Sequence, residues 1–369
     1  MRMINDTTVI RSKPMKSSHF HERFIEVMSN EELQLPLRID DNYKQTLQQL
    51  YNLYCFQISS FLSEKQVNAI RMICDIILQM VDEDDDEAMR VFERLMQIRV
   101  FKDNLHIIEN DLPIDGYGRK NINLFRLRKI NENRKYKRSD LFHDPKREEN
   151  YKKRKPYRYN LAERPSLYLS TTAYCCYKEL GSLDNQNILG AMFRLNSELN
   201  IPLYIVDLGN RPIDFIKQNN KYKKANIGYK ESEYLFVYPF IAACSVVVPS
   251  KEERNIVEYK MTEILYKWLV RNHNDKLCGI RYFSCHDACY SITDKDDNLI
   301  FERNSKTSFT KYFINYVFPV GKIMDDKGYC EKLKESFVIS TPRFMREYAT
   351  IKEFEESMKY ATQLMKIDK

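Results

Sequence analysis

Glycine is scarce in this sequence, with 9 among 369 residues. Neither GxxxxGK[ST] nor GxGxxG, the two glycine-rich loops that let a backbone approach nucleotide phosphates closely, occurs in it. The GxSxG turn that exposes the nucleophile of many serine hydrolases is missing as well. These absences argue against a P-loop NTPase, a Rossmann dehydrogenase and a serine hydrolase of that type.

Cysteine pairs with metal-site or redox spacing are also missing. The 9 Cys are an odd number, they are scattered, and no two of them form a CxxC. This usage does not suit a disulfide framework, so we expect reduced thiols. The segment Cys285–Cys289 (CHDAC) brings Cys and His together, but its spacing matches no standard zinc site. We therefore expect no metal.

No hydrophobic run reaches the length of a membrane helix. The most apolar stretch, 235–249, is shorter than the roughly 20 residues needed and contains Pro239. The first charges of the chain are not followed by an apolar block of signal-peptide length. We expect a cytoplasmic protein with no membrane partner. With 43% hydrophobic and 12% aromatic residues, the chain has enough apolar surface for a folded core of one to three domains.

Positive charge is concentrated in one segment. Residues 119–158 contain sixteen Lys or Arg and five acids, so that this segment carries +11 within a chain of net charge +7. The tract 152–159 (KKRKPYRY) is typical of a nucleic-acid patch with interleaved Tyr, or of a funnel for a phosphorylated small molecule. A solvated basic loop is an equally simple interpretation.

The N-terminal third is predicted to be helical. Between Asp41 and Phe101 apolar residues recur at helical spacing in three blocks, and the acidic run Asp82–Glu87 precedes the third block, where carboxylates cap a helix start. At Asp115–Gly118 (DGYG) the helical spacing of apolar residues stops. We place a small all-α N-terminal region at 1–115, a mixed domain at 116–345 and an amphipathic C-terminal helix within 346–369.

The sequence after Pro165 predicts both strands and helices. Apolar β-rich runs predict strands at LYLS, LYIVDL, YLFVYPFIAACSVVV, GIRYFS and FINYVFPV. Helical patterns lie between them at TAYCCYKELG, DFIKQNN and NIVEYKMTEILYKWLVRN. The sequence therefore predicts an α+β fold with a mixed β-sheet.

Within this region an ordered series of segments stands out: NLFRLRK, LFHDP, RYNLAERPSLYLSTTAYCCYKEL, YPFIAACSVVV, EYKMTEILYKWL, GIRYFS and INYVFPV. In order and spacing the series resembles the RES domain, a family named for an Arg, a Glu and a Ser. The resemblance covers 124–320, about half of the chain. It implies an ADP-ribosyltransferase-like fold and an NAD-consuming toxin of a toxin–antitoxin pair.

The polar positions of the family motif are all filled. There are five such positions, and two further residues are candidates for the cofactor site: Arg126, Arg158, Tyr168, Glu179 and Ser284, with His143 and Asn315. The chain departs from the family at Glu163-Arg164, where a Gly is usual. It departs again at Thr262 and Glu263, where the family has Pro and Gln.

The resemblance implies a role for each of these residues. Arg126 and Arg158 would hold the pyrophosphate of NAD through their guanidinium groups, and Tyr168 would stack on the nicotinamide. Glu179 would stabilise the positive charge that develops on the ribose carbon, with Ser284 as a hydrogen-bond partner and Arg126 completing the catalytic set. NAD is then the substrate, and the implied chemistry needs no metal.

Three functions remain open at this point. The first is an NAD glycohydrolase or phosphorylase acting as a bacterial toxin or defence effector. The second is an ADP-ribosyltransferase whose protein or nucleic-acid acceptor binds the basic segment 119–158. The third is a noncatalytic nucleic-acid-binding protein. An antitoxin or another inhibitory partner could cover the NAD site, or the N-terminal helices could do so in cis.

Overall fold

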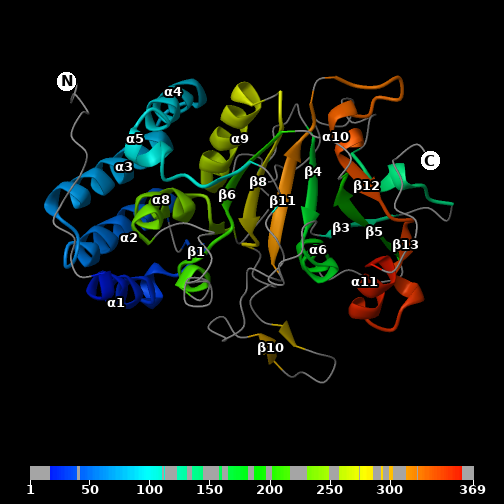
Figure 1. Ribbon diagram of the computed structural model, residues 1–369, viewed down its shortest axis with the longest axis horizontal. Helices are drawn as coiled ribbons and strands as arrows, with labels where there is room; N and C mark the ends of the chain where they lie inside the picture. The colour runs from blue at the N-terminus through cyan, green and yellow to red at the C-terminus, as the bar shows by residue number, and fades with distance from the viewer. Residues whose placement is uncertain are drawn as a thin grey trace.

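A computed structural model gives the fold of the chain (Figure 1). It describes residues 17–39, 42–109, 112, 123–130, 135–143, 158–159, 165–181, 187–196, 202–216, 231–248, 257–273, 275–285, 292–293, 299–301, 313–321 and 323–359. The described ranges contain both helices and a mixed β-sheet, so the predicted α+β class is confirmed.

The centre of the molecule is a nine-stranded sheet in the order β12-β5-β3-β4-β11-β8-β6-β2, with β13 also pairing with β5. Its strands are β2 (Ile107–Ile108), β3 (Leu124–Lys129), β4 (Ser166–Ser170), β5 (Ile188–Leu195), β6 (Leu203–Leu208), β8 (Leu277–Phe283), β11 (Ile314–Pro319), β12 (Phe337–Ile339) and β13 (Arg343–Phe344). Neighbouring strands are antiparallel except β6 and β8, which are parallel. The strands predicted at LYLS, LYIVDL, GIRYFS and FINYVFPV are confirmed as β4, β6, β8 and β11.

Register decides which side chains share a face of this sheet. Phe125, Ser170, Asn315 and Tyr282 are successive partners across β3, β4, β11 and β8. Phe125 packs in a cluster with residues of α6 (Ala173–Glu179) and α11 (Ile351–Lys359). We call this side the α6 face. Because side chains alternate along a strand, the neighbours of these residues point to the opposite face.

The helices gather mainly at the β6 and β2 end of the sheet, where Figure 1 shows the N-terminal helices beside α8 and α9. They are α1 (Ser17–Met28), α2 (Tyr43–Ile58), α3 (Glu64–Asp82), α4 (Asp85–Leu95), α5 (Arg99–Lys102), α8 (Glu231–Ala243) and α9 (Lys260–Asn272), while α10 (Glu331–Ser336) precedes β12. The helices predicted between Asp41 and Phe101 are confirmed. So is the cap, because Asp84 accepts the backbone N–H groups of Asp86 and Glu87 at the start of α4.

Three buried tyrosines of α2 tie the N-terminal helices to the rest of the protein. Their hydroxyls donate to backbone carbonyls of the α8 region at 2.7–2.8 Å: Tyr43 to Ala243, Tyr51 to Pro239 and Tyr54 to Leu235. One hydrophobic core runs from α1 through these helices into the sheet. The boundary predicted at Asp115–Gly118 lies outside the described residues.

The strand predicted at YLFVYPFIAACSVVV is wrong. Most of this run forms the helix α8, and only Val246–Val247 is a strand, β7, which pairs in parallel with β1 (Leu37–Arg38). Tyr234 to Ala243 are all buried. A helix buried on all sides is apolar all round and shows no 3.6-residue period, so an apolar run of this length can be a helix or a strand.

The remaining described elements are short. They are η1 (Glu31–Leu33), η2 (Arg138–Leu141), η5 (Val257–Tyr259), η8 (Met345–Glu347) and the two-stranded sheet of β9 (Ile292–Thr293) and β10 (Leu299–Phe301). The C-terminal amphipathic helix predicted from Thr350 is present as α11, with Phe354 and Met358 buried against the α6 face. No helix within the described ranges is both long and apolar enough to cross a membrane.

Candidate functional site

The position of Glu179 is set by the helix that ends with it. The α6 helix begins at Thr172, whose hydroxyl accepts the backbone N–H of Cys175 at 3.0 Å. The carboxylate of Glu355, on α11, accepts the N–H of Ala173 at 2.7 Å. The backbone N–H groups of Ala173 and Cys175, which a helix start leaves without partners inside the helix, therefore both have hydrogen-bond acceptors. The helix then delivers Glu179, half-buried, to the α6 face of the sheet.

Two neutral side chains from distant parts of the sequence converge on this carboxylate. Ser284, just after β8, donates to Oε1 of Glu179 at 2.5 Å, and Asn315, on β11, donates its Nδ2–H to the same oxygen at 2.9 Å. Both partners are buried. No described residue donates to Oε2, and no described Lys or Arg forms an ion pair with Glu179. The carboxylate is fixed in place, and no cation among the described residues pairs with its charge.

The amide of Asn315 is itself held in one orientation. Its Oδ1 accepts a hydrogen bond from the hydroxyl of Ser170, the partner of Asn315 in the β4–β11 register. The thiol of Cys175 donates to the same oxygen at 3.4 Å. With two donors on Oδ1, the Nδ2 end faces Glu179. The sequence did not single out Ser170, although its place in LYLS, two residues after Tyr168, puts both side chains on one face of the strand.

Tyrosines lie near the carboxylate, since the charge of Glu179 acts on Tyr282 and Tyr259. The hydroxyl of Tyr168 donates to the carbonyl of Tyr159 at 2.7 Å, and the ring of Tyr159 lies 4.6 Å from that of Tyr282, centroid to centroid. Burial raises the pKa of Tyr282 well above its usual value, and the nearby Tyr168 and Glu179 raise it further. Tyr159 and Tyr282 were not predicted as site residues. Alternation along GIRYFS could have found Tyr282, since it shares a face with Ser284.

Arg158 is engaged by the protein itself. Its Nη1 donates to the carbonyl of Cys244 at 3.1 Å, its Nη2 donates to that of Val246, and its guanidinium lies 5.1 Å from the centre of the Tyr259 ring. These contacts join Arg158 to the junction of α8 and β7. The hydroxyl of Thr262 lies within hydrogen-bond distance of the Arg158 carbonyl, so the residue that replaces the family's Pro holds this segment. A role for Arg158 toward pyrophosphate stays a prediction.

Arg126 and His143 lie on the other side of β3. Phe125 and Leu127 pack on the α6 face, so alternation directs the buried Arg126 to the opposite face. Arg128, on that same opposite face, donates to the carbonyl of Asp140 in η2. His143 follows η2, and its Nε2 accepts the backbone N–H of Cys330 at 2.7 Å. The structure thus brings Glu179, Ser284 and Asn315 into contact, with Tyr168 on their face, and places Arg126 and His143 apart from them.

Several predicted features lie outside the described residues. They are most of the basic segment 119–158 with its tract 152–155, the departure at Glu163-Arg164, and residues 286–289 of CHDAC. In the part of the chain that is described, no three His, Cys, Asp or Glu side chains gather where they could hold a metal ion.

Comparison with known proteins gives one relative of interest. The chain is 25% identical over 240 residues to a Bacillus subtilis (strain 168) protein named "Putative toxin YopC". The aligned region is 63% of this chain and 49% of that protein, so the chain spans about half the length of the curated relative it matches. No family model matches the chain. No solved structure matches it either.

Proposed function

We propose that the protein is a toxin that consumes NAD by breaking the bond between nicotinamide and ribose, with Glu179 as the catalytic carboxylate. The observation that carries this proposal is the pair of hydrogen bonds from Ser284 and Asn315 to one oxygen of Glu179. The similarity to a protein named as a toxin supports the biological class. The resemblance to the RES domain supplies the substrate.

The arrangement suits the chemistry of this bond. When it breaks, its electron pair stays with the nicotinamide nitrogen, and positive charge develops on the ribose carbon as in glycoside cleavage. A carboxylate held rigidly beside that carbon stabilises the charge without having to reorganise. Neutral donors on Oε1 fix Glu179 but leave its negative charge available. Nicotinamide departs as a neutral molecule, so the reaction does not require a general acid.

The tyrosines give the site a surface for a flat ring. Tyr168 and Tyr282 both lie on the face that carries Glu179, and aromatic rings pack well against a cationic heterocycle such as the nicotinamide of NAD. For the pyrophosphate the resemblance names Arg126 and Arg158. Because Arg158 is bound to backbone carbonyls and Arg126 faces away from α6, the proposal rests on the Glu179 group and not on the two arginines.

The test is the fate of NAD incubated with the purified protein, followed by mass spectrometry. The wild type should release nicotinamide, and Glu179→Gln should lower the rate by about 10² to 10³, because it keeps the side-chain volume and removes the charge. Glu356→Gln, the same change at an exposed position of α11, should behave as wild type. A folded Glu179→Gln variant with the wild-type rate would show that the carboxylate is not catalytic.

The second candidate, transfer of ADP-ribose to a macromolecule, is favoured by the +11 charge of residues 119–158. The same incubation separates the possibilities by product: ADP-ribose with water, a phosphorylated ADP-ribose with added phosphate, or labelled protein or nucleic acid with cell extract. A noncatalytic nucleic-acid-binding protein would leave NAD intact and bind polyanions in a strongly salt-dependent way.

A further inference from the structure

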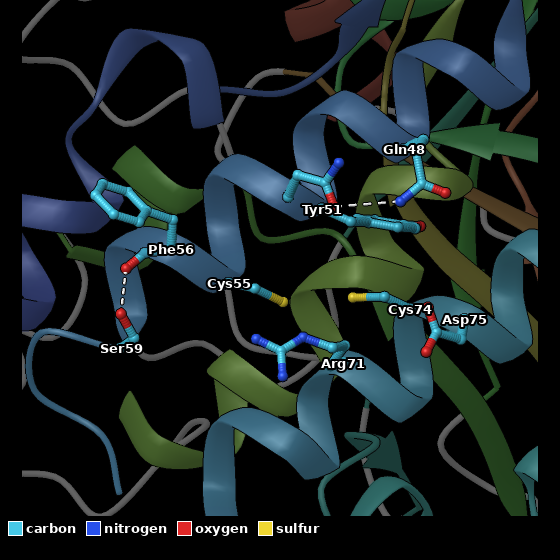
Figure 2. A pocket seen from close by; sticks show the side chains of 9 residues that line it. Gln48, Tyr51, Cys55, Phe56, Ser59, Arg71, Cys74 and Asp75 are labelled. Atoms are coloured by element: carbon cyan, nitrogen blue, oxygen red, sulfur yellow. Dashed lines mark hydrogen bonds between the residues drawn. The ribbon is translucent and has the colours of Figure 1, made fainter. Parts of the chain in front are cut away.

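A hollow of about 250 Å³ lies between α2 and α3, far along the sequence from the Glu179 group. Figure 2 shows it from close by, with the side chains of Cys55 and Arg71 at its centre and Cys74 and Asp75 beside them. Polar side chains line it together with the rings of Tyr51 and Phe56. A space of this size, lined by amide, guanidinium and carboxylate groups, admits small polar molecules.

Two thiols face each other in this hollow. Cys55 projects from α2 and Cys74 from α3, and Figure 2 shows their sulfur atoms pointing toward one another. Both cysteines are free, and Cys55, the more exposed of the two at 6%, lines the hollow. Two sulfurs directed at each other from adjacent packed helices meet one requirement of a disulfide, which is that the Cβ vectors converge.

The surroundings make the two thiols unequal. A hydrogen bond with Cys74 lowers the pKa of Cys55, and the positive charge of Arg71 acts in the same direction, against the effects of burial and of Asp75. Burial raises the pKa of Cys74 well above its usual value, and its partnership with Cys55 adds to this. The charge of Arg71 and the greater exposure of Cys55 both favour Cys55 as the thiol that reacts first. A reactive thiolate beside a resolving thiol is the combination found in redox-sensitive cysteine pairs.

We propose that Cys55 and Cys74 are a redox-active dithiol that a hydroperoxide oxidises to a disulfide joining α2 to α3. The Cys55 thiolate attacks one peroxide oxygen, the O–O bond breaks, and Cys55 becomes a sulfenic acid while hydroxide leaves. The Cys74 sulfur then attacks the Cys55 sulfur, the S–O bond breaks, and water departs with the Cys74 proton. In sum, two thiols and one hydrogen peroxide give one disulfide and two waters.

Peptide mapping tests the linkage directly. The reduced full-length protein is treated with a small molar excess of hydrogen peroxide, its remaining thiols are alkylated, and it is digested with trypsin. The two cysteines fall in separate peptides, 45–65 and 72–90, each with one Cys. We expect both peptides to lose alkylation together and to appear as one linked species, two hydrogens lighter than the sum of the two peptides. Dithiothreitol should reduce the link and give back the two separate peptides. A monomeric band on a non-reducing gel shows that the link is intramolecular.

Variants separate the two roles. In Cys74→Ser, Cys55 should stop at the sulfenic acid and be trapped by dimedone, whereas in Cys55→Ser the thiol of Cys74 should survive the same peroxide dose. Cys278→Ser, a change at another buried thiol whose pKa burial raises to about 11, should keep the link. The proposal is overturned if Cys55 and Cys74 are each oxidised without becoming linked, or if thiols such as Cys244 are lost before them in the wild type.

Discussion

Two carboxylates on opposite faces of the same sheet are held in opposite ways. Glu179, on the α6 face, receives hydrogen bonds from a serine hydroxyl and an asparagine amide. Asp207, on β6, forms an ion pair with Arg281 at 2.6 Å and accepts a hydrogen bond from the backbone N–H of Gly209 at 2.8 Å. Asp207 and Arg281 are register partners on the face opposite to the α6 face.

The partners decide what each negative charge can do. Burial alone would raise the pKa of Asp207, but Arg281 and His106 outweigh it and hold that pKa far below the usual range. Arg281 also hydrogen bonds to Tyr316. The negative charge of Asp207, a residue only 3% exposed, is therefore neutralised inside the protein. The donors on Glu179 position the carboxylate without neutralising it. The difference separates a carboxylate paired with a buried cation from one whose described partners are neutral donors.

Breaking the Asp207 pair should have the largest effect. Arg281→Met leaves a buried carboxylate without its cation, which costs about 3–5 kcal/mol of the free energy of unfolding. Urea denaturation measures the loss. The double variant Asp207→Asn with Arg281→Met, which removes both charges, should recover part of it. A single variant as stable as wild type would mean that the pair contributes nothing.

Glu179→Gln should show the reverse pattern. Its free energy of unfolding should stay within about 1 kcal/mol of wild type, because an amide can still accept the hydrogen bonds of Ser284 and Asn315 on its oxygen. The loss should appear in NAD cleavage instead. Unfolding and nicotinamide release measured on one preparation make this distinction. A large loss of stability would place Glu179 in the same class as Asp207.

Acid should weaken the contribution of Asp207 to stability. The pKa of Asp207 in the folded state is depressed, so its contribution is complete above its unfolded pKa, near 3.9, and is lost as pH falls toward the folded value. Wild type should lose about 1 kcal/mol for each pH unit below 4 from this group. Urea titrations of wild type and Asp207→Asn at pH 7 and pH 3 give the comparison. Equal acid sensitivity of the two proteins would contradict the assignment.

Ser170→Ala should have the smallest effect. It removes a hydrogen bond that orients Asn315, which is worth about 1 kcal/mol. If Ser170 positions the site, NAD cleavage should fall roughly tenfold at most, with the loss in kcat and not in KM. Ser336→Ala, a matched change at a buried serine of α10, removes a bond to the carbonyl of Lys332 and should leave kcat unchanged. Equal behaviour of the two variants would argue against positioning by Ser170.

Local patterns in the sequence determined a large part of this fold. The helices between Asp41 and Phe101, the cap at Asp84 and the strands β4, β6, β8 and β11 follow from periodicity, capping and β-branched or aromatic content, which act between near neighbours. The same signals predicted the α+β class. They failed at α8, because a helix buried on every side carries no periodic signal.

Only the tertiary structure decided how the polar side chains meet. Resemblance named Glu179 and Ser284, but they are 105 residues apart, and the 2.5 Å contact between them exists because α6 and the end of β8 lie on one face of the sheet. The bond from Ser170 to Asn315, the Tyr282 ring and the pair of Asp207 with Arg281 likewise depend on strand register. A sequence states which groups are available, whereas strand order and side-chain alternation determine which of them share a face.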